Sequence, residues 1–132
     1  MPSDAMTPED LNKLTEQIIG CAFKVSNALG VGFLEQVYEN ALAYELRRID
    51  LRVKQQDPIQ VMYDGIVVGD YIPDLVVNEF VVIEVKATRD HHEAFEACCL
   101  NYLAATKIPV CLLLNFGKPR LSVKRFVGQS FQ

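Results

Sequence analysis

The sequence has 132 residues, half of them hydrophobic and 23% charged, with a formal net charge of −4. This length fits a single domain, residues 1–132 with a loose start at residues 1–6, and leaves little room for two. The negative charge argues against binding of nucleic acid by broad electrostatics, and no apolar run approaches the roughly 20 residues that cross a bilayer.

Two helices are expected at the start of the chain. Residues 7–10, Thr-Pro-Glu-Asp, are typical of a helix start, because threonine caps, proline suits the first turn and a carboxylate favours the positive end of the helix dipole. Apolar residues then recur at helical spacing from Leu11 to Ala28. Glycines at positions 30 and 32 end this helix, and a second helix is predicted over residues 33–49.

Strands are expected after the second helix, because apolar and polar residues then alternate. Residues 59–63 and 66–69 flank Asp64-Gly65, a strong hairpin turn. The sheet is predicted to continue over residues 71–77 and, after a weaker turn, over residues 80–87. This last strand is the richest in valine and isoleucine, so we expect it at the centre of the sheet.

The rest of the chain predicts a parallel crossover. Asp90 and Glu93 resemble a capping box that opens a third helix over residues 91–106. A buried strand is predicted over residues 108–114 and a more polar strand over residues 121–127. A long helix between two apolar strands favours parallel pairing of those strands.

Charged side chains interrupt the apolar strand at residues 80–87. Glu84 and Lys86 project to one face at strand spacing, and charge in such a strand is costly unless it is paired, metal-bound or solvated. Asp74 lies on the strand expected to pair with this one. Two carboxylates and a lysine suit metal-assisted hydrolysis of phosphodiesters: carboxylate oxygens hold Mg²⁺, the metal activates water, and the lysine stabilises charge on the phosphate.

A shared site for these acids depends on the loop near Glu79. A clean two-residue turn at Asn78-Glu79 would place Asp74 opposite Ile83, facing away from Glu84. Pairing centred on Glu79 instead places the two acids on one face. We therefore predict a three-residue loop over residues 78–80, or a β-bulge or kink near one of the acids.

Several motifs occur in an order that resembles one family. They are Gly32-Phe33-Leu34-Glu35-Gln36-Val37-Tyr38, Pro73-Asp74 with Glu84-Val85-Lys86, Asn101-Tyr102-Leu103 and Leu114-Asn115-Phe116-Gly117. From about residue 11 to residue 127 the chain resembles the GxxExxY proteins of bacteria and archaea, a branch of the PD-(D/E)XK nuclease superfamily. The resemblance implies an α/β, restriction-endonuclease-like core with a mixed central β-sheet flanked by α-helices.

The resemblance also implies roles for individual residues. Asp74 and Glu84 would ligate Mg²⁺ or Mn²⁺, with the carbonyl oxygen of Val85 beside them. Lys86 would be the catalytic lysine. Glu35, on the second helix, would match the extra helical acid that many members of the superfamily place near the metal. All three acids and the lysine are thus the expected catalytic residues.

Other residues of the motifs have two interpretations. Tyr38 and Tyr102 are candidates for substrate binding, although aromatics at such positions more often pack in the core. Many relatives carry a glutamine four residues before the helical tyrosine, and this chain has Cys98 there. His91 and His92 are expected to be solvated, because neighbouring helical residues do not point the same way.

The acids and the lysine have structural alternatives as well. Glu84 and Lys86 can form an exposed ion pair of little energetic weight. Asp74 can be a turn residue after a proline. Glu35 suits the first turn of a helix, where a carboxylate favours the dipole, and the sequence alone favours this interpretation.

Two functions remain open at this point. One is a metal-dependent phosphodiester hydrolase acting on DNA or RNA, favoured by the intact Asp74, Glu84 and Lys86. The alternative is a non-catalytic nucleic-acid-binding or protein-assembly module that keeps the nuclease fold, favoured by the negative charge and by Cys98; a homodimer or protein partner would also fit. The four cysteines form no C-x-x-C pair, and the N-terminus does not resemble a signal peptide, so we expect a cytoplasmic protein with no membrane partner.

Overall fold

The structure, a computed structural model, describes residues 6–90 and 93–128. The described elements are α1 (Pro8–Leu29), α2 (Glu35–Arg48), β1 (Val53–Gln55), β2 (Ile59–Tyr63), β3 (Ile66–Tyr71), β4 (Leu75–Val77), β5 (Val81–Lys86), α3 (Glu93–Ala105), β6 (Val110–Asn115) and β7 (Ser122–Val127). His91 and His92 lie outside the described residues, as does most of the expected loose N-terminus.

A five-stranded mixed sheet forms the centre of the fold, with the order β1-β4-β5-β6-β7. Strands β5 and β6 are parallel, and α3 connects them, which confirms the predicted crossover. The other neighbouring pairs in this sheet are antiparallel. As expected, β5 lies in the middle of the sheet, so the fold is the mixed α/β arrangement that the sequence predicts.

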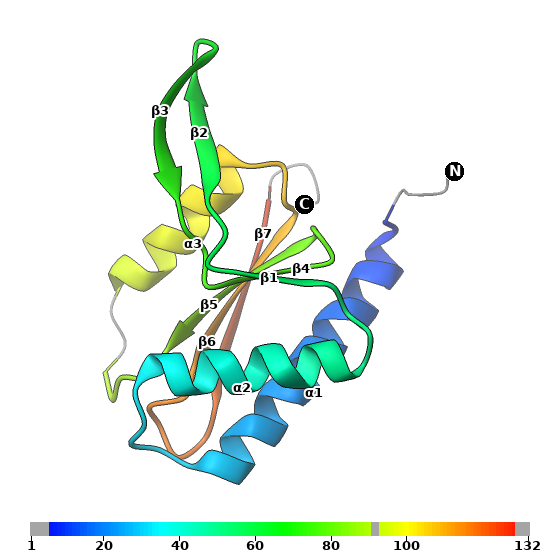
Figure 1. Cartoon of the computed structure of the whole chain (residues 1–132), viewed down its shortest axis with the longest axis vertical. Helices are drawn as coiled ribbons and strands as arrows, with labels where there is room; N and C mark the ends of the chain where they lie inside the picture. The colour runs from blue at the N-terminus through cyan, green and yellow to red at the C-terminus, as the bar shows by residue number, and fades with distance from the viewer. Residues whose placement is uncertain (1–5, 91–92, 129–132) are drawn as a thin grey trace.

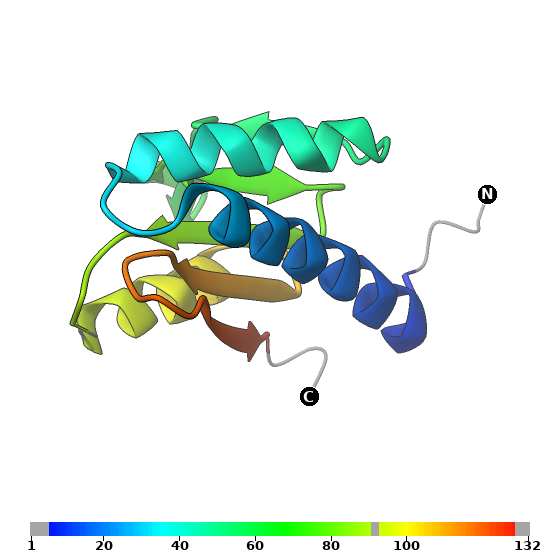
Figure 2. The same cartoon turned by 90° about the horizontal axis from the view of Figure 1, so that it is seen from below.

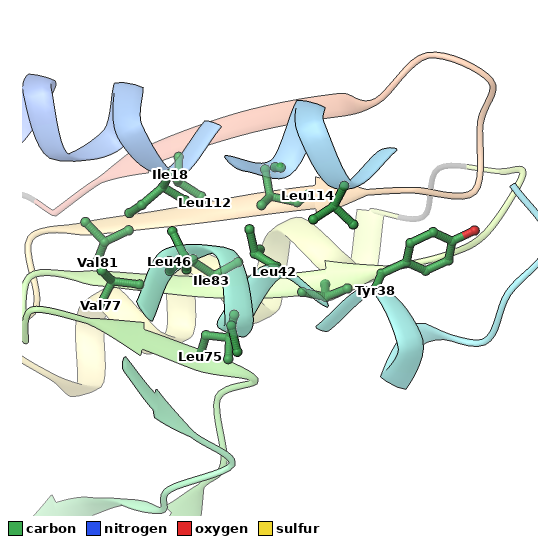
Figure 3. Packing of buried hydrophobic residues seen from close by; sticks show 14 of the residues in the cluster. Ile18, Tyr38, Leu42, Leu46, Leu75, Val77, Val81, Ile83, Leu112 and Leu114 are labelled. Carbon is green, nitrogen blue, oxygen red and sulfur yellow. The ribbon is translucent and has the colours of Figure 1, made fainter. Parts of the chain in front are cut away.

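Helices cover both faces of this sheet. Helices α1 and α2 lie side by side on one face, where Ile18, Leu42 and Leu46 pack against Ile83 and Leu112 (Figures 2 and 3). Helix α3 covers the other face and packs there against alternate residues of β4, β5 and β6. Successive residues of a strand face opposite sides of the sheet. The position of each charged residue in β5 therefore decides whether its side chain faces α1 and α2 or faces α3.

The hairpin β2–β3 differs from the prediction. It was expected to continue the central sheet, but it forms a separate two-stranded sheet that projects from the body of the molecule (Figure 1). Pro58 and Pro73 stand on either side of the hairpin, and a proline cannot donate to a strand ladder, so both connections to the main sheet are interrupted. One edge of the main sheet is instead β1, a short strand absent from the prediction.

The loop between β4 and β5 confirms the register prediction. Val77 pairs with Val81, which leaves three residues in the loop and centres the pairing on Glu79. Asn78 and Glu79 both have positive φ values, of 50° and 65°, and the N–H of Phe80 donates to the carbonyl of Val77 at 3.0 Å. Phe80 is therefore the additional residue that follows a tight turn.

The side chain of Asn78 holds this turn against the chain before β1. Its Oδ1 accepts from the N–H of Arg52 at 2.8 Å, and its own N–H donates to the carbonyl of Arg52 at 2.8 Å. Asparagine tolerates the left-handed conformation better than most residues.

Among the described residues, no helix is both long and apolar enough to cross a membrane.

Candidate active site

Asp74 lies directly before β4, where the β4–β5 register, extended by one residue, places it opposite Glu84. The Oδ2 atom of Asp74 accepts a hydrogen bond from the N–H of Val85 at 2.8 Å. This bond ties the carboxylate to the neighbouring strand although Asp74 itself is outside the ladder. The two acids that the sequence pairs are therefore brought together, on the side of the sheet that α3 covers.

Glu84 is a buried carboxyl group in an unfavourable electrostatic position. Its side chain is only 8% exposed. Burial raises its pKa to about 8, the charge of Asp74 acts in the same direction, and the charge of Lys86 opposes both. Its Oε1 atom has no hydrogen-bond partner among the described residues. A buried oxygen without a donor is costly, so this atom is free to bind a cation.

Tyr102, on α3, holds the Glu84 carboxyl from the helix side. Its hydroxyl donates a hydrogen bond to Glu84, and burial together with the charge of Glu84 raises the pKa of Tyr102. The ring packs edge-to-face on Tyr71, with 4.9 Å between ring centroids. Tyr102 is itself buried, so the structure gives it a contact with Glu84 rather than an open surface for a substrate.

Lys86 ends β5 on the same face as Glu84. Its Nζ atom lies 4.7 Å from the ring centroid of Phe95, in the first turn of α3. The lysine is half-buried, and a cation over an aromatic face is held there by the ring quadrupole. The ammonium group is thus kept close to the acids without being neutralised by a salt bridge to them.

A third carboxylate, missed in the sequence, lies beside Asp74. Glu39 of α2 is only 3% exposed. Burial raises the pKa of Asp74, the N–H of Val85 opposes this, and the charge of Glu39 raises the pKa further. The signal for Glu39 is present in the sequence, because it falls within the buried stripe of α2, next to Tyr38 and one turn before Ala43.

Glu35, the acid that the resemblance implies for the helix, makes no hydrogen bond to Asp74 or Glu84 among the described residues. It is the first residue of α2, its side chain is exposed, and no hydrogen bond or ion pair of the described residues involves that side chain. The side chain of Glu39 reaches Asp74 through their shared donor Gln56, whereas that of Glu35 is exposed.

Tyr38 lies in the core, in agreement with the structural interpretation that the sequence left open beside substrate binding. Its side chain is fully buried and its ring stacks on Phe116, with 4.8 Å between centroids. Its hydroxyl donates to the carbonyl of Gly30 at 2.6 Å and accepts from the N–H of Phe33 at 3.2 Å. Both hydrogen-bonding functions of the hydroxyl are thus used to fix the loop that precedes α2.

The Leu114–Gly117 motif supports the site from β6. Asn115 pairs with Lys86 across the parallel strands, and its side-chain amide both accepts from and donates to the backbone of Thr88. A Cβ atom at Gly117 would lie 2.3 Å from the nitrogen of Thr88, so only glycine fits there. The loop that follows Lys86 is therefore held by its neighbour on β6.

The donors at this site are all of one chemical kind. Asp74, Glu84 and Glu39 offer carboxylate oxygens and Val85 a carbonyl oxygen, which suit Mg²⁺ or Mn²⁺ rather than a metal that prefers sulfur or nitrogen. Across residues 6–90 and 93–128, no three acidic, histidine or cysteine side chains converge on one point as they stand. The Oε1 atom of Glu84 is nevertheless buried without a hydrogen-bond partner among the described residues, and a divalent cation would satisfy it.

This chain is similar to known proteins in sequence family and in fold. A family model described as the PD-(D/E)XK nuclease superfamily matches residues 12–126. Among solved structures, the chain is similar in fold to an alkaline exonuclease, LHK-Exo, from Laribacter hongkongensis. The two have 14% sequence identity and a TM-score of 0.50, over 96% of this chain and 73% of the other. No curated protein sequence matches the chain.

Proposed function

The chain belongs to the PD-(D/E)XK nuclease superfamily, and from this premise we propose that it is a metal-dependent phosphodiester hydrolase acting on DNA or RNA. The observation that carries the proposal is the three-residue loop before β5, because it sets the half-buried Asp74 opposite the buried Glu84. The fold shared with an alkaline exonuclease agrees with it.

The proposed metal ligands are Asp74, Glu84 and the carbonyl oxygen of Val85. A bound Mg²⁺ or Mn²⁺ would polarise the phosphoryl oxygen and lower the pKa of a water molecule. Glu84 must release its proton for such binding, because a ligand carboxylate is deprotonated. The buried acids therefore make metal affinity increase with pH across the pKa of about 8 that Glu84 has without metal.

Lys86 is proposed to bind the phosphate and to stabilise the charge that develops on it during hydrolysis. Phe95 keeps the ammonium group in place, at 4.7 Å from its ring centroid. Tyr102 would orient Glu84 through its hydroxyl, as a positioning residue. The ammonium group of Lys86, beside the carboxylate pair, attracts a phosphodiester locally although the protein has a net charge of −4.

The test is cleavage of a panel of single-stranded, duplex and branched DNA and of RNA, with Mg²⁺ or Mn²⁺. We expect Lys86→Ala to lose cleavage by a factor on the order of 10²–10³, with an unchanged far-UV circular dichroism spectrum. The exposed Lys107 serves as the matched control, and Lys107→Ala should cleave like wild type. Wild-type rates for Lys86→Ala would remove this residue from the mechanism.

The second candidate is a non-catalytic module that binds nucleic acid or a protein partner. It is favoured by the fact that, within the described part of the chain, no three potential ligands already converge. The same panel separates the candidates. Binding of nucleic acid without cleavage under every metal condition would support the module, and a homodimer would then be sought by light scattering.

We also propose a reducing, cytoplasmic location. The four cysteines are all free thiols, including Cys99 and Cys111, which share a hydrogen bond in the core. Neighbouring thiols that form no disulfide support a location in a reducing compartment.

A further inference from the structure

Gln56 follows directly after β1 and touches two of the acids at once. Its Nε2 atom donates to Oε1 of Glu39 at 2.9 Å and to Oδ1 of Asp74 at 3.1 Å. An amide nitrogen carries two hydrogens, so both are used, one for each carboxylate. The point between the two acids is thereby occupied by a donor.

The backbone of Gln56 is bound to the same acid. Its N–H donates to the carbonyl of Asp74 at 3.0 Å, and its φ value is 54°. A positive φ is uncommon for a residue other than glycine, asparagine or aspartate. Gln56 is thus held in an unusual conformation by the residue that its side chain also contacts.

Glu39 and Asp74 accept hydrogen bonds from uncharged donors. Oε2 of Glu39 accepts from Gln55 at 2.7 Å and from Gln36 at 3.2 Å, and Oδ2 of Asp74 accepts from Val85. Among the described ion pairs, none involves Glu39 or Asp74. The buried Glu39 and the half-buried Asp74 repel each other in the absence of a cation. Among the residues that donate hydrogen bonds to these two acids, Gln56 contacts both.

We propose that Gln56 is a positioning residue, which fixes Asp74 against Glu39 in the orientation in which Asp74 receives a divalent cation. The inference rests on the proposed function, since Gln56 acts only through the acids. Asp74 is held on one side by Val85 and on the other by Gln56, which leaves its orientation toward Glu84 fixed before any cation binds.

The first test is the affinity for Mn²⁺, measured by calorimetry. Gln56→Met keeps the length of the side chain and removes both N–H donors. Partners of metal ligands typically contribute about 10–100-fold to metal affinity, so we expect Gln56→Met to bind Mn²⁺ at least about tenfold more weakly. Gln36→Met is the matched control: it also loses a bond to Glu39 but has none to Asp74, and it should stay within about twofold of wild type.

An affinity of Gln56→Met equal to or above that of wild type would overturn the proposal, because the amide would then be dispensable or would block the site. A second measurement does not need metal. In EDTA, the Gln56→Met variant should have a lower melting temperature than wild type. The same substitution should lower the melting temperature much less in a protein that already carries Asp74→Asn. Equal losses in both backgrounds would show that Gln56 acts elsewhere.

The two measurements also distinguish the two proposals. If the wild-type protein binds no Mn²⁺, the proposed function fails, and the melting temperatures alone decide the role of Gln56. If wild type binds Mn²⁺ but Gln56→Met binds it equally well, the proposed function stands and only the positioning role is lost.

Discussion

Replacement of Glu84 by glutamine should remove most of the pH dependence of stability in the metal-free protein. Burial, and then the charge of Asp74, raise the pKa of Glu84 from its ordinary value of 4.5 to about 8. The folded protein keeps a proton on this carboxyl group where the unfolded chain has already released it. The free energy of unfolding therefore falls as the pH rises from about 4.5 to about 8 and is level above that.

The size of this effect follows from the two pKa values of Glu84, which differ by about 3.5 pH units. Each pH unit corresponds to about 1.4 kcal/mol, so the full loss is on the order of 5 kcal/mol. This is a large part of the stability of an ordinary domain, about 5–15 kcal/mol. Asp74 adds to the slope in the same direction, because burial raises its pKa as well.

The assay is urea unfolding in EDTA at a series of pH values from about 5 to about 9. The amide of Glu84→Gln resembles the protonated acid, so this variant should be more stable than wild type at high pH and show a shallower slope. Glu16, exposed on α1, gives the control Glu16→Gln, which should follow wild type. A Glu84→Gln slope as steep as that of wild type would refute the reasoning about this carboxyl group.

Four further predictions concern single residues. Lys86→Ala should lose cleavage by a factor on the order of 10²–10³ and leave the melting temperature within a few degrees of wild type, as activity and thermal unfolding together will show. Glu39→Ala should weaken Mn²⁺ binding measured by calorimetry, whereas Glu35→Ala should not, because only Glu39 is buried beside Asp74. Gly117→Ala should destabilise the fold by about 1–3 kcal/mol in urea, because its Cβ would overlap the loop after β5; Gly20→Ala, with open space in α1, should stabilise it by about 0.5–1 kcal/mol.

The register of the acids was predictable because it follows from counting. Side chains on paired strands alternate with a period of two, so only pairing centred on Glu79 can place Asp74 and Glu84 on one face. The structure has this pairing, with the loop over residues 78–80. The crossover was predictable for a similar reason, since a helix between two apolar strands leaves few arrangements of the sheet.

The position of Glu39 beside Asp74 was not predictable in the same way. A helix pattern gives the buried face but not how far along the sheet each turn lies, so Glu35 and Glu39, one turn apart, were not distinguished. Burial of Glu39 depends on the amides of Gln55 and Gln56, which are distant in sequence and become its partners only after β1 docks on β4. Strand β1 itself has three residues, too few for an alternating pattern to be recognised.

Cleavage by the purified wild-type protein in EDTA, Mg²⁺ and Mn²⁺, beside the same reactions with Asp74→Asn, tests the central claim most directly. A metal-dependent site at Asp74 and Glu84 predicts cleavage of at least one nucleic acid with a divalent metal, none in EDTA, and none by Asp74→Asn although that variant remains folded. Cleavage that persists in EDTA, or that Asp74→Asn catalyses at the wild-type rate, would contradict it.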